Sequence, residues 1–173
     1  MLKILGMGLH KTGTRTISKA LEILGYNSNH GGRDVNIALV NKKIDFKKLN
    51  KYDAIFDGFC CLKYRTLDSH YDDLKFIYTT RNLESWLASC QHRYRGHIET
   101  ITRKAVFGEF AFDKKIWTDS YLRHEKQVRD YFKGRNDILE INIEEKNKWE
   151  KLCEFLNCDI PEVEFPWIGK RRA

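Results

Sequence analysis

The sequence contains no long hydrophobic run, and this absence excludes a membrane-spanning helix. Such a helix needs about 20 consecutive apolar residues, and no stretch of the 173-residue chain approaches that length. Lys3 interrupts the first apolar residues and the run ends at the glycines that follow, so we expect no secretory signal peptide. Internal repeats, low-complexity segments and linkers are also absent. We therefore expect a single domain over residues 1–173.

Cysteine is too scarce and too unevenly placed for a disulfide framework. The chain has five cysteines, which is an odd number, two of them are adjacent, and no C-x-x-C pair occurs. We predict free thiols in a reducing, cytoplasmic environment. No cluster of side chains with metal-ligand spacing is evident either, so the sequence predicts no metal site.

Acidic residues are outnumbered by basic ones, and the formal net charge is +7. This excess suits a small anionic ligand, and it also suits nucleic acid. The basic residues are spread along the chain, with short runs such as those at 42–43, 47–48 and 170–172. The aromatic residues mostly fit core positions of helices and strands rather than a base-stacking platform. We therefore expect no nucleic-acid partner, and a non-catalytic nucleotide- or nucleic-acid-binding protein ranks last among the alternatives.

The most informative segment is the glycine-rich sequence Leu5–Thr16. It follows a short apolar run and precedes an apolar pattern of helical period, which predicts a strand, a turn and a helix. Backbone N–H groups and the positive end of the helix dipole then meet at one point, where an anion binds. Lys11 adds a positive charge, and Thr12, Thr14 and Thr16 add hydroxyl donors.

This turn differs from both common phosphate-binding loops. A nucleoside-triphosphate P-loop ends in Gly-Lys followed by Ser or Thr, but here Lys11 precedes Thr-Gly-Thr and no Gly-Lys pair occurs. A dinucleotide-binding turn has a third glycine three residues after the second. Gly6 and Gly8 fit the first two places, but Lys11 occupies the third. The turn alone therefore predicts an anion without identifying it.

The remaining pattern alternates strands with helices, which predicts a three-layer α/β fold with a parallel sheet flanked by helices. Strands are expected near 1–5, 52–58, 75–81 and 138–143, helices over 14–24, 35–40, 44–49, from 82, over 121–131 and 149–156, and a loop over 26–33. Residues 96–120 are long, polar and aromatic, and are the best candidate for a lid or acceptor-binding insert. In parallel sheets, ligands bind beyond the carboxyl ends of the strands. The glycine-rich turn, Asp57 and Arg81 all lie there.

A second anion site is predicted where the strand 75–81 ends. Arg81 is its last residue, and Asn82 caps a following helix that carries Ser89 about 12 Å along its axis at 1.5 Å per residue. An arginine and a hydroxyl in this arrangement can hold a phosphate at a distance from the first turn. Two such sites suit a ligand with two separated phosphates.

These two segments resemble those of the sulfotransferases that use 3′-phosphoadenosine 5′-phosphosulfate (PAPS). Residues 8–14, Gly-Leu-His-Lys-Thr-Gly-Thr, are similar to the family's 5′-phosphosulfate loop, and residues 76–89 to its 3′-phosphate segment, with Arg81 and Ser89 in register. Further matches to small sulfotransferase-like proteins occur in order at 53–57, 107–108, 121–128, 149–156, 161 and 165–166. The resemblance implies a P-loop-like sulfotransferase fold and PAPS as co-substrate. It also implies a hydroxyl or amine acceptor, either a small molecule or a glycan.

The resemblance also implies site residues. Lys11 would be catalytic and contact the bridging and sulfuryl oxygens. The cradle for the 5′-phosphate would contain His10, Lys11, Thr12, Gly13, Thr14, Arg15 and Thr16. Arg81 and Ser89 would hold the 3′-phosphate, and Lys170 or Arg171 would close over it. Asp57 lies where related enzymes often place an acidic general base, with His10, His70 and His124 as alternatives.

Two further questions stay open in the sequence. A metal-dependent P-loop kinase, with Asp57 as the magnesium ligand, is the main alternative function, and the missing Gly-Lys-Ser/Thr argues against it. The sequence does not identify the acceptor or the oligomeric state.

Overall fold

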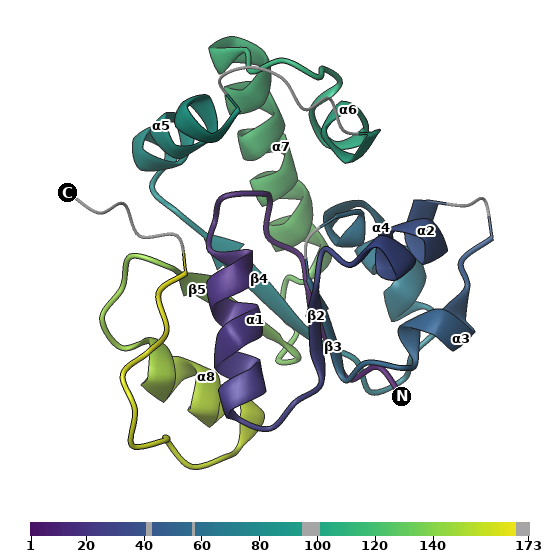
Figure 1. Cartoon of the computed structure of the whole chain (residues 1–173), viewed down its shortest axis with the longest axis vertical. Helices are drawn as coiled ribbons and strands as arrows, with labels where there is room; N and C mark the ends of the chain where they lie inside the picture. The colour runs from purple at the N-terminus through teal and green to yellow at the C-terminus, as the bar shows by residue number, and fades with distance from the viewer. Residues whose placement is uncertain (41–42, 57, 95–100, 169–173) are drawn as a thin grey trace.

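The computed structural model describes residues 1–40, 43–56, 58–94 and 101–168. These residues contain a five-stranded sheet in the order β2-β3-β1-β4-β5, in which every neighbouring pair is parallel (Figure 1). The strands are β1 (Ile4–Gly6), β2 (Ser28–His30), β3 (Ala54–Phe56), β4 (Lys75–Thr80) and β5 (Ile138–Asn142). Helices cover both faces, so the predicted three-layer α/β fold is confirmed.

Side chains of the central strands alternate between the two faces of the sheet, as the pleat requires. Leu5 packs into the core on one face and Ile4 into the core on the other, and β4 divides Phe76 and Ile77 in the same way. The first face is covered by α2 (Arg33–Val40), α3 (Phe46–Leu49), α4 (Cys60–Asp68) and α7 (Lys114–Tyr131), and the second by α1 (Thr14–Ile23) and α8 (Lys148–Leu156).

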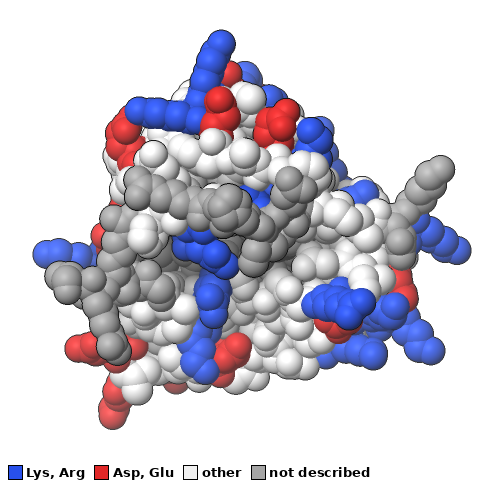
Figure 2. All heavy atoms as spheres, turned by 45° about the horizontal axis from the view of Figure 1, so that its top comes forward, with Lys and Arg blue, Asp and Glu red and all other residues white. Residues whose placement is uncertain are grey.

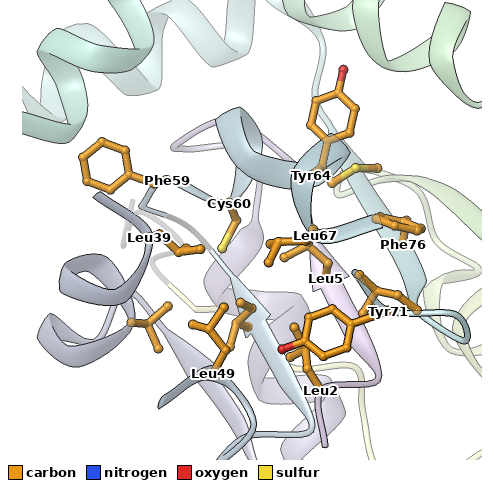
Figure 3. Packing of buried hydrophobic residues seen from close by; sticks show 14 of the residues in the cluster. Leu2, Leu5, Leu39, Leu49, Phe59, Cys60, Tyr64, Leu67, Tyr71 and Phe76 are labelled. Atoms are coloured by element: carbon orange, nitrogen blue, oxygen red, sulfur yellow. The ribbon is translucent and has the colours of Figure 1, made fainter. Parts of the chain in front are cut away.

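The core on the first face joins the sheet to three short helices. Figure 3 shows Leu5 and Phe76 of the sheet among Leu39 of α2, Leu49 of α3 and Leu67 of α4. All five side chains are fully buried. Each contributes about 1.5–3 kcal/mol by leaving water, which offsets the low stability of such short helices in isolation.

A third cluster lies at the carboxyl edge of the sheet, at the top of Figure 1, where α5 (Leu83–Arg93) and α6 (Ile101–Phe107) pack on α7. Phe107 stacks on Trp117 with 3.9 Å between ring centroids, and both side chains are buried. The buried Trp86 donates from Nε1 to the carbonyl of His10 at 2.8 Å. This hydrogen bond connects the third cluster to the turn after β1. Val106, Phe107 and Trp117, which belong to the expected 96–120 insert, are therefore part of a buried cluster.

Several helix signals in the sequence correspond to the observed hydrogen bonds. The Asp45 carboxylate accepts from the backbone N–H of Lys48 at the start of α3, and the Asn82 side chain accepts from two N–H groups at the start of α5. Gly25 follows α1 with φ +88°, a conformation that favours glycine.

Four elements differ from the sequence prediction. The helix α6 lies within residues 96–120, where no helix was predicted. The expected loop 26–33 contains β2, whose three polar residues show no hydrophobic alternation and whose position is the sheet edge. The helix α4 was not predicted, because its N-cap Phe59 provides no capping side chain. The helix α7 starts at Lys114, capped by Asp113, rather than near 121. The predicted fourth strand is consequently β5.

Within the described residues, no helix combines the length and the apolar character needed to cross a membrane. The five cysteines all lie within the described residues and form no disulfide, as predicted, and only Cys158 is exposed.

Candidate functional site

A cleft of about 670 Å³ opens at the carboxyl edge of the sheet. The strand order explains its position. The chain leaves β1 toward β2 and β3 on one side and later returns to β4 on the other, and ligands of α/β sheets bind where the order reverses in this way. Figure 2 turns this edge toward the viewer. Lys and Arg side chains lie in the middle of that face as well as along its rim, while most Asp and Glu lie toward the rim.

The turn between β1 and α1 is fixed to β4. The Thr12 hydroxyl donates to the carbonyl of Leu9 at 2.7 Å and lies 2.7 Å from the Thr79 hydroxyl. A Cβ on Gly8 would lie 1.8 Å from the Thr79 hydroxyl oxygen, so only glycine fits at this position. Thr12 is 1% exposed and does not line the cleft. Its hydroxyl therefore stabilises the turn through Leu9 and Thr79 and does not face a ligand as predicted.

The first turn of α1 offers backbone donors to the cleft. Gly13 is its N-cap and carries no capping side chain. No described residue accepts a hydrogen bond from the backbone N–H groups of Gly13, Thr14 or Arg15. Because these donors and the helix dipole favour negative charge, the geometry fits an anion.

The threonine hydroxyls of α1 connect it to two other parts of the cleft wall. The Thr14 hydroxyl lies 2.9 Å from Nε2 of His30, at the end of β2. The Thr16 hydroxyl accepts from the backbone N–H of Ile168 at 3.1 Å and so fixes the C-terminal segment beside α1. Trp149 of α8 also holds this segment, since its Nε1 donates to the carbonyl of Val163 at 2.8 Å.

Lys11 lines the cleft at the tip of the turn, with φ +71°. Burial lowers the pKa of its ammonium group, and the charges of Arg93, Arg81 and Arg15 lower it further, against an opposing effect of Cys90. These shifts indicate a desolvated cation among other cations. An anion in the cleft would relieve this repulsion.

One side of α5 and its start carries a row of residues spaced by four positions: Arg81, Ser85, Ser89 and Arg93. All four line the cleft. The predicted pair Arg81 and Ser89 therefore lies in the same cleft as Lys11. Ser85 and Arg93 were missed, although the four-residue spacing in the sequence is the signal that points to them.

Most of the predicted site residues line this one cleft: His10, Lys11, Gly13, Thr14, Arg15, Thr16, Arg81 and Ser89. Three predicted residues, Asp57, Lys170 and Arg171, lie outside the described residues. His30 and Trp167 also line the cleft and were missed. His30 falls in the segment that was expected to be loop, so no pattern in the sequence pointed to it.

The three histidines considered as general bases occupy different environments. His10 lines the cleft. His70 stacks on Phe46 with 3.4 Å between ring centroids, outside the cleft wall. His124 is buried, and its Nε2 donates to the carbonyl of Met7 at 2.8 Å. Burial lowers the pKa of His124. Of these three, only His10 faces the cleft.

The charges of the wall have one sign. Among the described residues that line the cleft there are lysine and arginine side chains but no carboxylate. No group of three or more His, Cys, Asp or Glu within the described residues has an arrangement suited to a metal ion.

A parallel sheet with a glycine-rich turn, a helix N-terminus that lines the cleft and a second basic row at its switch point defines a class of nucleotide-binding α/β proteins. The chain belongs to one family of this class, the sulfotransferase domain family, whose sequence pattern it matches over residues 3–110 and 93–173. The resemblance predicted from the two anion-binding segments is therefore confirmed.

Two relatives show how far the similarity extends. The chain is 27% identical over 215 aligned residues to the Ava biosynthesis cluster protein M of Aspergillus versicolor, covering 96% of this chain and 80% of that protein. Its fold is similar to the crystal structure of mouse sulfotransferase SULT7A1 complexed with PAP, with a TM-score of 0.56 and 17% identity. That match covers 95% of this chain but 60% of the mouse chain, so this chain is the shorter of the two.

Proposed function

We propose that this protein transfers a sulfuryl group from PAPS to a hydroxyl or amine acceptor. The observation that carries the proposal is that Lys11 and the row beginning with Arg81 and Ser89 line one cleft. A donor with phosphates at both the 5′ and 3′ positions of one ribose needs two such basic sites. Membership of the sulfotransferase domain family and the likeness to a mouse enzyme complexed with PAP support this choice of donor.

The residues of the cleft have separate roles in this proposal. The first-turn N–H groups of α1 hold the 5′-phosphate, and Arg81 with Ser89 holds the 3′-phosphate. Lys11 stabilises the negative charge that develops on the leaving phosphate oxygen. Lys170 or Arg171 closes over the 3′-phosphate.

The reaction is an in-line displacement at sulfur. The acceptor oxygen or nitrogen forms a bond to sulfur, while the bond between sulfur and the 5′-phosphate oxygen breaks and adenosine 3′,5′-bisphosphate (PAP) leaves. Because such transition states are loose, catalysis is mainly positioning and charge stabilisation. Asp57 takes the acceptor proton, an effect of about 10²–10⁴-fold. His10 is the alternative base, because it lines the cleft.

The acceptor is proposed to be a small molecule or a glycan that binds beside α6. The support is that His10, which lines the cleft, lies with its ring centroid 6.0 Å from that of Phe107 of α6. Residues 96–120 would then contribute to acceptor binding.

Titration calorimetry with PAP and with ATP, each with and without magnesium, tests the donor. We expect PAP to bind without magnesium and Arg81→Ala to weaken that binding. Binding of ATP only with magnesium, and none of PAP, would instead support a kinase. A labelled-sulfate screen of phenols, sugars and amines then identifies the acceptor. With that acceptor, Asp57→Asn is expected to lower kcat, and an unchanged kcat would exclude Asp57 as the base.

A further inference from the structure

The carboxylate of Glu144 contacts three groups at and just before the start of α5. Glu144 is the second residue after β5, more than 50 residues along the chain from α5. It accepts hydrogen bonds from Nε of Arg81 at 3.1 Å, from the Ser85 hydroxyl at 2.7 Å and from the backbone N–H of Asn82 at 3.2 Å. These contacts join two neighbouring strand ends at the wall of the cleft.

The hydrogen bonds fix the guanidinium of Arg81 from one side. Its Nε donates both to Glu144 and, at 3.0 Å, to the Ser85 hydroxyl, which in turn donates to Glu144. Within the described residues, no carboxylate accepts from the two Nη atoms of Arg81. The Nη edge, which is the forked edge that recognises phosphate, is therefore left for a ligand.

Glu144 is ionised at neutral pH in this arrangement. Burial alone would raise the pKa of its carboxyl group, but the hydrogen bonds from Ser85 and Asn82 and the charge of Arg81 outweigh this effect, and the pKa is lowered. Its position at the N-terminus of α5 is one where negative charge is favoured.

We propose that Glu144 is the positioning residue of the 3′-phosphate site. It holds Arg81 by the Nε edge, so that the Nη edge can meet a phosphate, and it thereby sets the preference for nucleotides that carry a 3′-phosphate. This inference rests on the proposed function, which assigns Arg81 to that phosphate.

Two effects of Glu144 oppose each other. Its charge repels a phosphate, whereas its hydrogen bonds remove the rotamer entropy that a free arginine loses on binding. Positioning is the larger effect.

Calorimetric titration with PAP and with adenosine 5′-monophosphate (AMP) tests this inference, because the two nucleotides differ in the 3′-phosphate. We expect Glu144→Ala to lose on the order of tenfold in affinity for PAP and less than about twofold for AMP. Glu144→Gln keeps an oxygen that accepts from Arg81 and Ser85, so we expect it to stay within about threefold of the wild type. Glu145→Ala is the matched control, since it removes the same charge one residue away, where the carboxylate pairs with Lys151 of α8.

The same titrations in an Arg81→Ala background show whether Glu144 acts through Arg81. We expect Glu144→Ala to have no further effect on PAP affinity there. Equal losses for PAP and AMP, or additive losses in the double variant, would show a merely structural role. Tighter PAP binding by both the Ala and Gln variants would show that the carboxylate opposes the phosphate, and would overturn the inference. A wild-type protein that binds no PAP would refute the proposed function and, with it, this inference.

Discussion

The phenol of Tyr121 donates a hydrogen bond to the backbone carbonyl of Arg81, with 2.6 Å between the two oxygens. Tyr121 lies in the middle of α7, and Arg81 is the residue at which the chain leaves β4 for α5. The long helix on one face of the sheet therefore fixes the backbone of a residue that faces the cleft. Because both partners of this contact are buried or half-buried, its loss should be felt in stability and in ligand binding.

Tyr121→Phe removes this hydrogen bond, together with the longer one of 3.4 Å that the phenol accepts from the backbone N–H of Arg81, and keeps the ring that packs in the third core cluster. We expect the free energy of unfolding to fall by about 1 kcal/mol, the usual contribution of one such hydrogen bond, and PAP affinity to fall by about threefold. Urea unfolding and calorimetry measure the two effects. Tyr52→Phe is the control, since it removes a tyrosine–Asp34 hydrogen bond outside the cleft and should leave PAP affinity unchanged.

Lys11→Ala is expected to lower kcat by at least about 10²-fold, the usual cost of removing one preorganised charge-stabilising group at a transition state. The fold should remain, because Lys11 is a partly exposed residue at the tip of a turn and its backbone conformation is as accessible to alanine as to lysine. Turnover with the acceptor found by screening measures the effect. Lys19→Ala, which removes an exposed lysine that pairs with Glu22 on α1, is the control. Undiminished turnover of the Lys11 variant would remove it from the mechanism.

The parts of the site that could be predicted are those determined by residues close together in the sequence. The turn around Lys11 and the cap at Asn82 are read from neighbouring residues, and both lead directly to the cleft. The contact between Arg81 and Glu144 was not predictable in this way. It depends on β4 and β5 being neighbours in a register that pairs Thr80 with Asn142, and this register follows from the packing of the whole sheet.

The edge strand β2 was also not predicted, because its own residues carry no strand signal. Its residues Ser28, Asn29 and His30 have low strand propensity and are only half-buried, so nothing local marks them as a strand. They become one because β3 offers hydrogen-bonding partners along its free edge. His30 reaches the cleft only as a consequence of that pairing.

Gly13→Ala is expected to destabilise the protein strongly and to abolish PAP binding. Gly13 has φ +99°, and a Cβ there would lie 2.3 Å from Cγ1 of Ile143, which follows β5. Backbone strain costs about 1–3 kcal/mol, and forcing an extra methyl group into a packed site typically costs about 1–3 kcal/mol more. Urea unfolding and calorimetry measure the losses.

Gly25→Ala separates the two causes of that loss. Gly25 has φ +88°, but a Cβ there would meet no atom within 4 Å. Its substitution should therefore cost only the conformational strain, about 1–2 kcal/mol, and leave PAP affinity unchanged. Equal destabilisation by the two variants would mean that contact with Ile143 does not restrict the turn. Ile143→Ala removes Cγ1 and Cδ1 and leaves only the 2.7 Å approach to Cβ, so Gly13→Ala should cost less stability in an Ile143→Ala background than in the wild type.

His124 is expected to make the stability of the protein depend on pH in mildly acidic solution. It is 7% exposed, and it donates from Nε2 to the carbonyl of Met7, the residue that begins the turn after β1. Burial lowers the pKa of His124 in the folded state, so the unfolded chain binds a proton more readily. The stabilisation is therefore fully present above the unfolded pKa of about 6.5, and it is lost as the pH falls from there toward the folded value.

Urea unfolding at pH 7.5, 6.5 and 5.5 should show this loss in the wild type. In His124→Gln, which cannot gain that proton, the dependence over this range should be weaker, while the exposed control His92→Gln should behave like the wild type. Parallel pH profiles for His124→Gln and the wild type would mean that the imidazole is not the group responsible.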